Sequence, residues 1–342
     1  MMTTAAHPAL TSVGGHARTP AEVTGAHPLR ARPRVRDWLR REWLSPRDLI
    51  APVLVQPDQR PPGEYADLPT AVASADLPRL IGQLWDSGVG AVKLFCYVED
   101  KTADAAAALA VDNLLVSAVR TVRHAVPGMV IATEVCGCAW TDSGECVLLD
   151  GAGRVDLDAT FGLMTAMAVT HAAAGADIVG PAAVLEGSVR AIRRALDADG
   201  YSDVGITPSV IFDSALFGIY KVAMHTNPGR GNRRGLQIDA CHVGQALDTA
   251  HRWLDEGADS LLVQPAMMAV DLLTRLREQT RVPITAFSVS GEHRMLAGAG
   301  DAVYVEYLRA LRRAGADLVM TYGAYQVAAV LREHAGAERG PA

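Results

Sequence analysis

A short phrase that recurs three times constrains this chain more than any other feature. Each copy places a glycine, an alanine and an aspartate directly before an apolar run: AGAD at 174–177, EGAD at 256–259 and AGAD at 314–317. The glycine is typical of a helix that ends in a left-handed residue, and the apolar run predicts a buried strand. The chain is therefore expected to repeat a unit of helix, glycine and strand.

Eight short apolar segments alternate with amphipathic helical stretches from Ile50 onward. We predict strands at 51–55, 91–97, 130–136, 178–181, 205–210, 260–266, 284–290 and 318–323. Continuous apolar strands indicate a parallel sheet that is buried on both faces. Eight such units over residues 49–342 predict an α/β fold of the (β/α)8 TIM-barrel type. An open doubly wound sheet is the alternative, but no G-x-G-x-x-G follows the first strand.

Composition restricts the partners and the compartment. The 342 residues carry a formal net charge of −6 without a basic stripe, which argues against a nucleic-acid partner. The apolar runs fall short of a membrane span, and the start of the chain lacks the pattern of a secretory signal. Five cysteines, three of them clustered, fit a reducing compartment better than a disulfide framework. We expect a soluble, cytoplasmic protein.

The first 48 residues differ from the rest. Residues 1–27 are rich in Ala, Thr, Gly, His and Pro without periodicity, which predicts a disordered tail. Residues 28–48 carry many arginines with interspersed Trp and Leu. They are interpreted either as an N-terminal arm that packs outside its own domain or as a solvated basic linker.

Three cysteines gather where the third predicted strand ends. Cys136 and Cys138 share one side of an extended backbone, and the turn-forming TDSG segment can fold Cys146 back toward them. Three thiolates with one open position are a donor set for catalytic zinc. The alternative is three buried cysteines without a ligand, since free cysteine is common in protein cores.

Other polar residues follow the predicted strands at the end where barrel enzymes hold their active sites. They are Glu134 after the third strand, Ser209 after the fifth, Gln264 after the sixth, Ser290 and Glu292 after the seventh, and Tyr322 after the eighth. Any one of them can simply cap its strand. Their convergence on one rim favours a functional site.

At this point the sequence resembles the porphobilinogen synthase family, also called 5-aminolevulinate dehydratase. The resemblance runs from about Leu29 to the end of the chain, through LSPRDLIAPVLV at 44–55, EVCGCAWTDSGEC at 134–146, AGADIVGP at 174–181, GRGNRRGLQID at 229–239, VSGE at 289–292 and ADLVMTY at 316–322. It implies a (β/α)8 barrel, an arm that wraps a neighbouring subunit, and a homo-oligomer from a dimer up to an octamer.

The resemblance also implies a chemistry for which this chain lacks residues. The family joins two molecules of 5-aminolevulinate into a pyrrole through two lysines that form Schiff bases with the substrate ketones. Ile211 and Gln264 occupy the two lysine positions here, and neither side chain has an amine that can attack a carbonyl. After the fourth strand, Ala182 and Ala183 replace a polar pair.

The metal ligands and the carboxylate contacts are kept. By resemblance, Cys136, Cys138 and Cys146 bind zinc, Glu134 stands for the preceding aspartate, Lys221, Arg233 and Gln237 bind one substrate carboxylate, Ser290 and Tyr322 bind the other, and Ser209 is a further substrate contact. Lysine lacks the bidentate fork of the usual arginine, so recognition at position 221 is expected to loosen. Residues 213–237 are expected to form a mobile lid.

Three functions are compatible with this pattern. The one we favour is a repurposed zinc lyase that condenses or dehydrates an amino-keto acid or related carboxylate without lysine Schiff bases, with protons moved by Glu134 or Tyr322 and with negligible normal dehydratase activity. The second is a non-catalytic paralogue that binds such a ligand or a sister subunit. The third is porphobilinogen synthase in tetrapyrrole biosynthesis with a relocated lysine, Lys93, which strand alternation can point into the barrel.

Overall fold

The computed structural model describes residues 44–226 and 235–338, with side chains as far as Glu333. In this part of the chain the strands form one parallel sheet. Their bounds are β1 Leu49–Gln56, β2 Ala71–Ala73, β3 Ala91–Cys96, β4 Val130–Val135, β5 Ile178–Pro181, β6 Gly205–Ile206, β7 Ser209–Ile211, β8 Leu261–Gln264, β9 Ile284–Ser288 and β10 Leu318–Thr321. The sheet has a strand at each of the eight predicted places, and the short β2 was not predicted.

The sheet closes on itself at the segment 205–211. Hydrogen-bonded neighbours run in the order β6-β5-β4-β3-β1-β10-β9-β8-β7, and β6 and β7 are the two halves of that one segment. Its first half pairs with β5 and its second half with β8. The strand predicted at 205–210 is thus interrupted at Thr207 and Pro208, since proline has no N–H to give to the ladder. This closure confirms the predicted (β/α)8 barrel.

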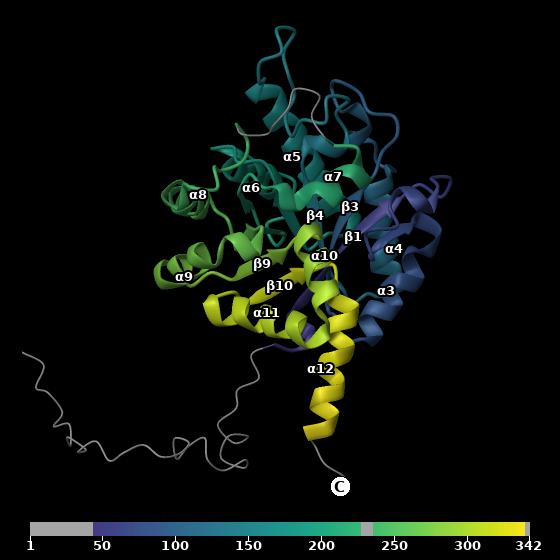
Figure 1. Ribbon diagram of the computed structural model, residues 1–342. Helices are drawn as coiled ribbons and strands as arrows, with labels where there is room; N and C mark the ends of the chain where they lie inside the picture. Colours follow the sequence, from purple (N-terminus) through teal and green to yellow (C-terminus); the bar gives the residue numbers. More distant parts are fainter. Residues whose placement is uncertain (1–43, 227–234, 339–342) are drawn as a thin grey trace, which may run out of the picture. The chain divides into compact units, whose positions relative to one another are not determined.

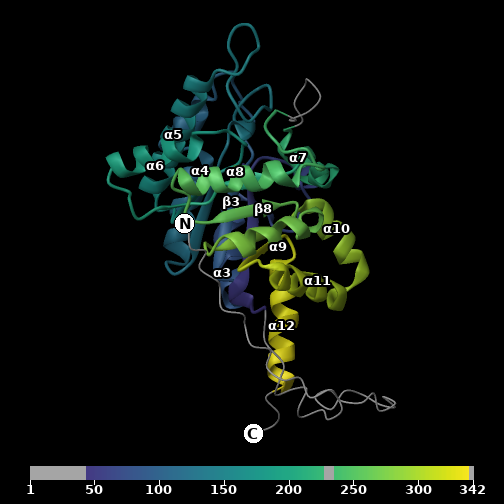
Figure 2. The same ribbon diagram turned by 90° about the vertical axis from the view of Figure 1, so that its left-hand side faces the viewer.

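Helices surround the strands, as two perpendicular views show (Figures 1 and 2). Their bounds are α3 Leu77–Asp86, α4 Leu114–Ala125, α5 Leu157–Ala174, α6 Ser188–Ala198, α7 Gly218–Met224, α8 Val243–Asp255, α9 Val270–Gln279, α10 Ser290–Ala299, α11 Asp301–Ala314 and α12 Ala324–Glu338. In α3, for example, Leu77, Ile81 and Leu84 are buried, which is the spacing of one helix face turned toward a sheet. No helix in the described residues is long and apolar enough to cross a membrane.

The recurring phrase builds the amino-terminal rim of the barrel. Its glycines, Gly175, Gly257 and Gly315, have φ of 105°, 105° and 124°, a conformation that favours glycine. Each following aspartate accepts a hydrogen bond from the backbone N–H of the preceding barrel strand, at 2.8 Å: Asp177 from Ile131, Asp259 from Ile206 and Asp317 from Ile284. The glycines and aspartates of the phrase therefore have a structural role at this rim. The active site is expected at the opposite rim, where the strands end.

The amino-terminal predictions fall mainly outside the described residues. These are the tail over 1–27 and most of the arm over 28–48. Within 44–48, Leu44 is buried, and Ser45 and Asp48 form a capping box around the short turn η1 Pro46–Asp48, directly before β1. The role of the arm in subunit contact stays a prediction.

His171 should make the fold sensitive to acid. It is fully buried on α5, where Nδ1 lies 3.1 Å from the Thr133 hydroxyl of β4, and burial lowers the pKa of His171 from 6.5 to about 4. Between pH 6.5 and about pH 4, His171 binds a proton in the unfolded chain but not in the native state. The free energy of unfolding therefore falls as the pH decreases through this window. The largest loss is about 3 kcal/mol.

We therefore expect His171→Leu to flatten the pH dependence of the free energy of unfolding between pH 6.5 and 4, measured by urea titration. The matched control is His124→Leu, at an exposed position on α4. An unchanged slope in His171→Leu would contradict the assignment.

Candidate active site at the carboxyl-terminal mouth of the barrel

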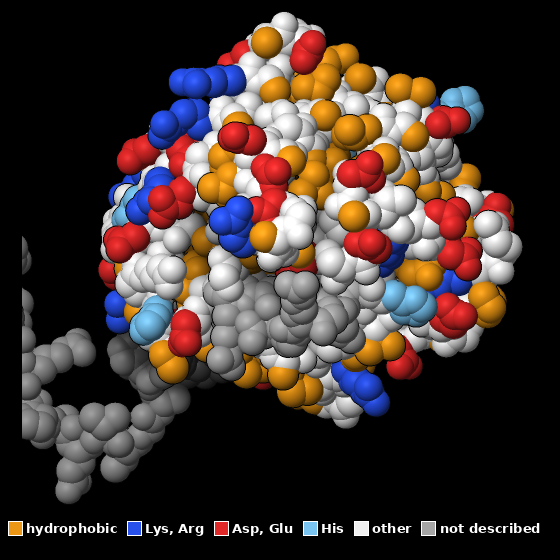
Figure 3. Space-filling view, turned by 90° about the horizontal axis from the view of Figure 1, so that it is seen from above, with side chains coloured by type: hydrophobic (Ala, Val, Ile, Leu, Met, Phe, Trp, Pro, Cys, Tyr) orange, Lys and Arg blue, Asp and Glu red, His pale blue; other side chains and the backbone are white. Residues whose placement is uncertain are grey.

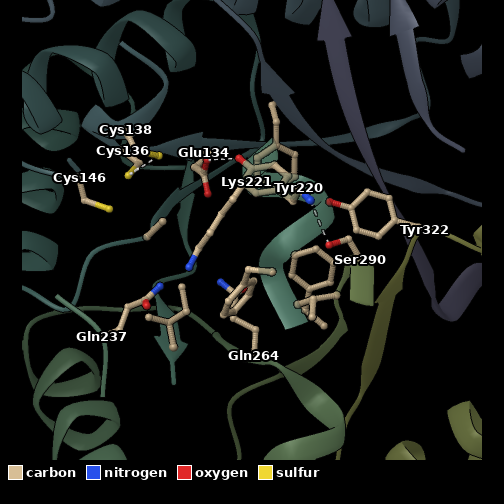
Figure 4. A pocket seen from close by; sticks show the side chains of 16 residues that line it. Glu134, Cys136, Cys138, Cys146, Tyr220, Lys221, Gln237, Gln264, Ser290 and Tyr322 are labelled. Carbon is tan, nitrogen blue, oxygen red and sulfur yellow. Dashed lines mark hydrogen bonds between the residues drawn. The ribbon is translucent and has the colours of Figure 1, made fainter. Parts of the chain in front are cut away.

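One cavity at the carboxyl ends of the strands gathers most of the predicted site residues. Ten of them line it: Glu134, Cys136, Cys138, Cys146, Ile211, Lys221, Gln237, Gln264, Ser290 and Tyr322 (Figure 4). Apolar walls come from Phe95, Phe217, Phe287 and Val289. The volume open to water-sized molecules is about 50 Å³, which is room for only a few waters. A substrate must therefore displace side chains that now fill the mouth.

The three cysteines converge as predicted. Their sulfurs all lie within 4.8 Å of one another, and Sγ of Cys136 and Sγ of Cys138 are 3.3 Å apart. All three are buried. Hydrogen bonding to Cys138 and Cys146, together with burial, raises the pKa of the Cys136 thiol well above its usual value. A cation that binds the cluster would therefore release protons.

Gly137 lets the third cysteine return to the other two. It opens the turn η5 Gly137–Ala139, and its N–H donates to the carbonyl of Cys146 at 3.2 Å. A Cβ at this position would lie 2.9 Å from that carbonyl oxygen, so the close approach requires glycine. Three thiolates in a buried cluster fit a soft cation such as zinc, and because they leave one coordination position for substrate or water, they fit a catalytic rather than a structural ion.

Glu134 lies between the thiol cluster and two phenols. The Tyr220 hydroxyl donates to Oε2 of Glu134 at 3.3 Å. Burial and the charge of Glu134 raise the pKa of both Tyr220 and Tyr322, so both phenols stay protonated at neutral pH and act as hydrogen-bond donors. Tyr220 was not predicted, because its place on α7 depends on contacts that are remote in sequence.

Helix α7, which carries Tyr220 and Lys221, is held at both ends. At its start, the Ser290 hydroxyl accepts from the Tyr220 N–H at 3.2 Å and donates to the Leu216 carbonyl at 3.3 Å. At its end, Nζ of Lys101 donates to the carbonyls of Met224 and His225 at 2.9 and 3.2 Å. Ser290 thus supports the helix as well as lining the cavity.

A second group of side chains holds the same end of α7. The Arg60 guanidinium stacks 3.4 Å from the Tyr97 ring centre, and its Nη2 lies 3.5 Å from Nε2 of His225. The Tyr97 hydroxyl lies 3.3 Å from Nδ1 of the same histidine. The segment predicted as a lid, 213–237, therefore includes a well-anchored helix. Residues 227–234, with the predicted carboxylate ligand Arg233, lie outside the described residues.

The two positions that carry lysine in the resembling family lie side by side. Ile211 ends β7, Gln264 ends β8, and the two residues are partners in the strand register. Both line the cavity. Lys221 lines the same cavity, and its side chain extends across it toward the side of Gln237 and Gln264 (Figure 4).

Lys93 points into the barrel, one layer below the cavity. It precedes the cavity residue Phe95 by two positions on β3, so both face the same side. Its Nζ lies 3.1 Å from where a Cβ of Gly180 would stand, and 5.5 Å from the Phe95 ring centre. Burial lowers the pKa of Lys93, while the nearby Glu134 and Cys136 oppose that shift. Lys93 does not line the cavity itself.

Two residues of the predicted rim lie away from the cavity. Ser209 is fully buried, and its hydroxyl lacks a hydrogen-bond partner among the described residues. Glu292 accepts from the Tyr307 hydroxyl at 2.7 Å and from the Met267 N–H at 3.1 Å, and burial raises its pKa to about 7. Glu292 therefore ties α11 to the loop after β8, and substrate contact by Ser209 stays a prediction.

Known proteins are similar to this chain in sequence and fold. The family model for delta-aminolevulinic acid dehydratase matches residues 24–330. The delta-aminolevulinic acid dehydratase of Streptomyces coelicolor is 34% identical over 323 residues, 90% of this chain and 98% of its own. That of Halalkalibacterium halodurans is 32% identical over 315 residues, 89% and 96% of the two chains. The crystal structure of the Toxoplasma gondii enzyme in complex with its product porphobilinogen has a TM-score of 0.85 and 29% identity, over 93% of this chain and 95% of that one.

Proposed function

The chain belongs to the delta-aminolevulinic acid dehydratase family, and from that premise we propose that it is a zinc-dependent lyase acting on amino-keto acids. The observation that carries the proposal is that three thiols able to share one cation line the same cavity as Ser290, Tyr322 and Lys221. The proposed substrate is a carboxylic acid that also carries a ketone. Ser290, Tyr322 and Lys221 can bind its carboxylate, and the apolar walls can contact its carbon chain. The reaction is a condensation with loss of water.

The residues of the chain have distinct roles in this proposal. Cys136, Cys138 and Cys146 would hold zinc, which would supply Lewis acidity to the reaction. The Tyr322 hydroxyl donates to a substrate carboxylate, since the raised pKa of Tyr322 keeps its proton in place. The Ser290 hydroxyl joins it by turning its proton from the Leu216 carbonyl to the substrate. Glu134, steadied by Tyr220, accepts a proton from the carbon or nitrogen that reacts.

One positive charge that can attract an acidic substrate lies inside the cavity. On the face shown in Figure 3, hydrophobic side chains are interspersed with acidic ones and with Lys and Arg. Among the described residues that line the cavity, Lys221 is the one with a cationic side chain. Carboxylate recognition by Lys221 with Gln237, expected by resemblance, is one role open to it.

A non-catalytic binding protein is the second candidate. It is favoured by Ile211 and Gln264, which line the cavity where the resembling family has its two amines. Such a protein would bind an amino-keto acid without converting it.

We expect the purified protein to contain about one zinc ion per chain and to consume 5-aminolevulinate. Pyrrole should account for only a small part of that consumption, because one amine lines the cavity where two-imine chemistry needs two. Metal content by mass spectrometry, substrate loss and pyrrole formation are measured separately. If 5-aminolevulinate were still consumed after complete removal of zinc, the metal would have no role in the reaction. If calorimetry showed that 5-aminolevulinate binds without being consumed, the non-catalytic binding protein would be favoured.

A further inference from the structure

The three lysines of the chain lie in three different settings. Lys101 is engaged with the backbone carbonyls at the end of α7. Lys93 is buried under the cavity floor, against Gly180. Lys221 alone of the three lines the cavity. A substrate that enters the mouth therefore meets the amine of Lys221 first.

The surroundings of Lys221 suit a nucleophile. Its side chain extends across a cavity of about 50 Å³, so a substrate cannot enter without touching it or displacing it. Its Nζ lies 5.7 Å from the Phe217 ring centre, and Phe95 and Phe287 form other walls. A lysine amine attacks a carbonyl carbon once it has lost its proton, and Glu134, which lines the same cavity, is a base that can accept that proton.

We propose that Lys221 is the catalytic amine of this chain, forming a covalent imine with the ketone of the substrate. This inference rests on the proposed function and names the residue that carries out its first step. The Nζ lone pair forms a bond to the carbonyl carbon, and both carbon–oxygen bonds of that carbonyl are then broken. Once a base has taken the third proton of the ammonium group, the oxygen leaves as water with the two hydrogens that remain on the nitrogen, so the step needs no oxidant or reductant.

The location of this amine accounts for a chain without strand-end lysines. Ile211 and Gln264 are partners on β7 and β8, and both line the cavity. The Lys221 amine extends toward the side of Gln264 (Figure 4). An amine carried by α7 thus enters the same cavity as the ends of β7 and β8. Lys93 is a weaker candidate, because Phe95 of the same strand lines the cavity above it.

Trapping with borohydride tests the assignment without relying on turnover. The protein is incubated with levulinate, a keto acid that lacks the amino group, then reduced, digested and mapped by mass spectrometry. We expect an adduct on the peptide that contains Lys221, present in wild type and in Lys93→Met and absent from Lys221→Arg. An adduct on Lys93, or none in wild type, overturns the proposal.

Lys221→Arg separates covalent chemistry from carboxylate binding. Arginine keeps the positive charge and improves the fit to a carboxylate, but its guanidinium stays protonated and forms no imine. We expect turnover of 5-aminolevulinate to fall by roughly 1,000-fold or more, with zinc content and thermal unfolding unchanged. Turnover kept within about tenfold, with the change confined to KM, would assign Lys221 to carboxylate binding and reject the imine.

The two proposals can fail separately. Zinc-dependent consumption of substrate without an adduct on Lys221 would reject the lysine assignment and leave the proposed function standing. An adduct on Lys221 without any consumption would support the assignment and reject the proposed function.

Discussion

Replacing Cys138 with serine is expected to remove the metal from this protein and to abolish zinc-dependent turnover. The Cys138 sulfur is buried 3.3 Å from that of Cys136, inside a cluster whose three sulfurs lie within 4.8 Å of one another. A serine hydroxyl does not ionise to the soft anion that such a site uses. Loss of a residue that only hydrogen-bonds to a metal ligand lowers metal affinity by about 10- to 100-fold. Loss of a ligand itself should therefore lower metal affinity by more than about 100-fold.

Two other cysteines of the chain provide matched controls. Cys241 is exposed, and Cys96 is buried at the end of β3 but is not a member of the cluster. Cys241→Ser and Cys96→Ala should keep one metal ion per chain. Zinc at 100 times its Kd should stabilise wild type and both controls by roughly 2.7 kcal/mol, and should leave Cys138→Ser unchanged. Full metal content and turnover in Cys138→Ser would show that the cluster is not the metal site.

The barrel could be predicted because local signals agreed with one another. Glycine, aspartate and apolar run recur at 174–177, 256–259 and 314–317, and each copy has the same structure. The interruption of the fifth strand also had a signal, since Pro208 lacks an N–H for the ladder. The strand β2 had none, because three residues are too few to show a period.

The parts of the site that depend on alternation along a strand could be predicted from the sequence. The parts that depend on a helix positioned by residues remote in sequence could not. Alternation along β4 put Cys136 and Cys138 on one side, and the structure agrees. Alternation along β3 left two directions open for Lys93, and only the barrel shows that it points inward. Tyr220 and the direction of the Lys221 amine depend on contacts of α7 with Ser290, seventy residues away in sequence. A local sequence pattern gives no information about a contact between residues so far apart in the chain.

The start of α7 is fixed by a backbone contact that leaves no room for a side chain. Gly291 is the second residue of α10, and a Cβ there would lie 2.6 Å from the carbonyl oxygen and 2.9 Å from the Cα of Leu216. The adjacent Ser290 bonds to the same Leu216 and to Tyr220. A methyl group at position 291 must therefore push the turn η6 Ala215–Phe217, and α7 behind it, away from the mouth.

We expect Gly291→Ala to lower turnover by about 100-fold, because a displacement near 1 Å costs that much when catalytic groups lose their alignment. The overpacking should also lower the free energy of unfolding by about 1–3 kcal/mol, whereas zinc content should stay at one ion per chain, since none of the three cysteines belongs to α7 or α10. Gly298→Ala is the matched control: it lies on the same helix with nothing within 4 Å of the new Cβ, and alanine there should stabilise by about 0.5–1 kcal/mol without changing turnover. If Gly291→Ala kept both wild-type stability and wild-type turnover, the contact with Leu216 would not position α7, and the alignment of Tyr220 and Lys221 would need another cause.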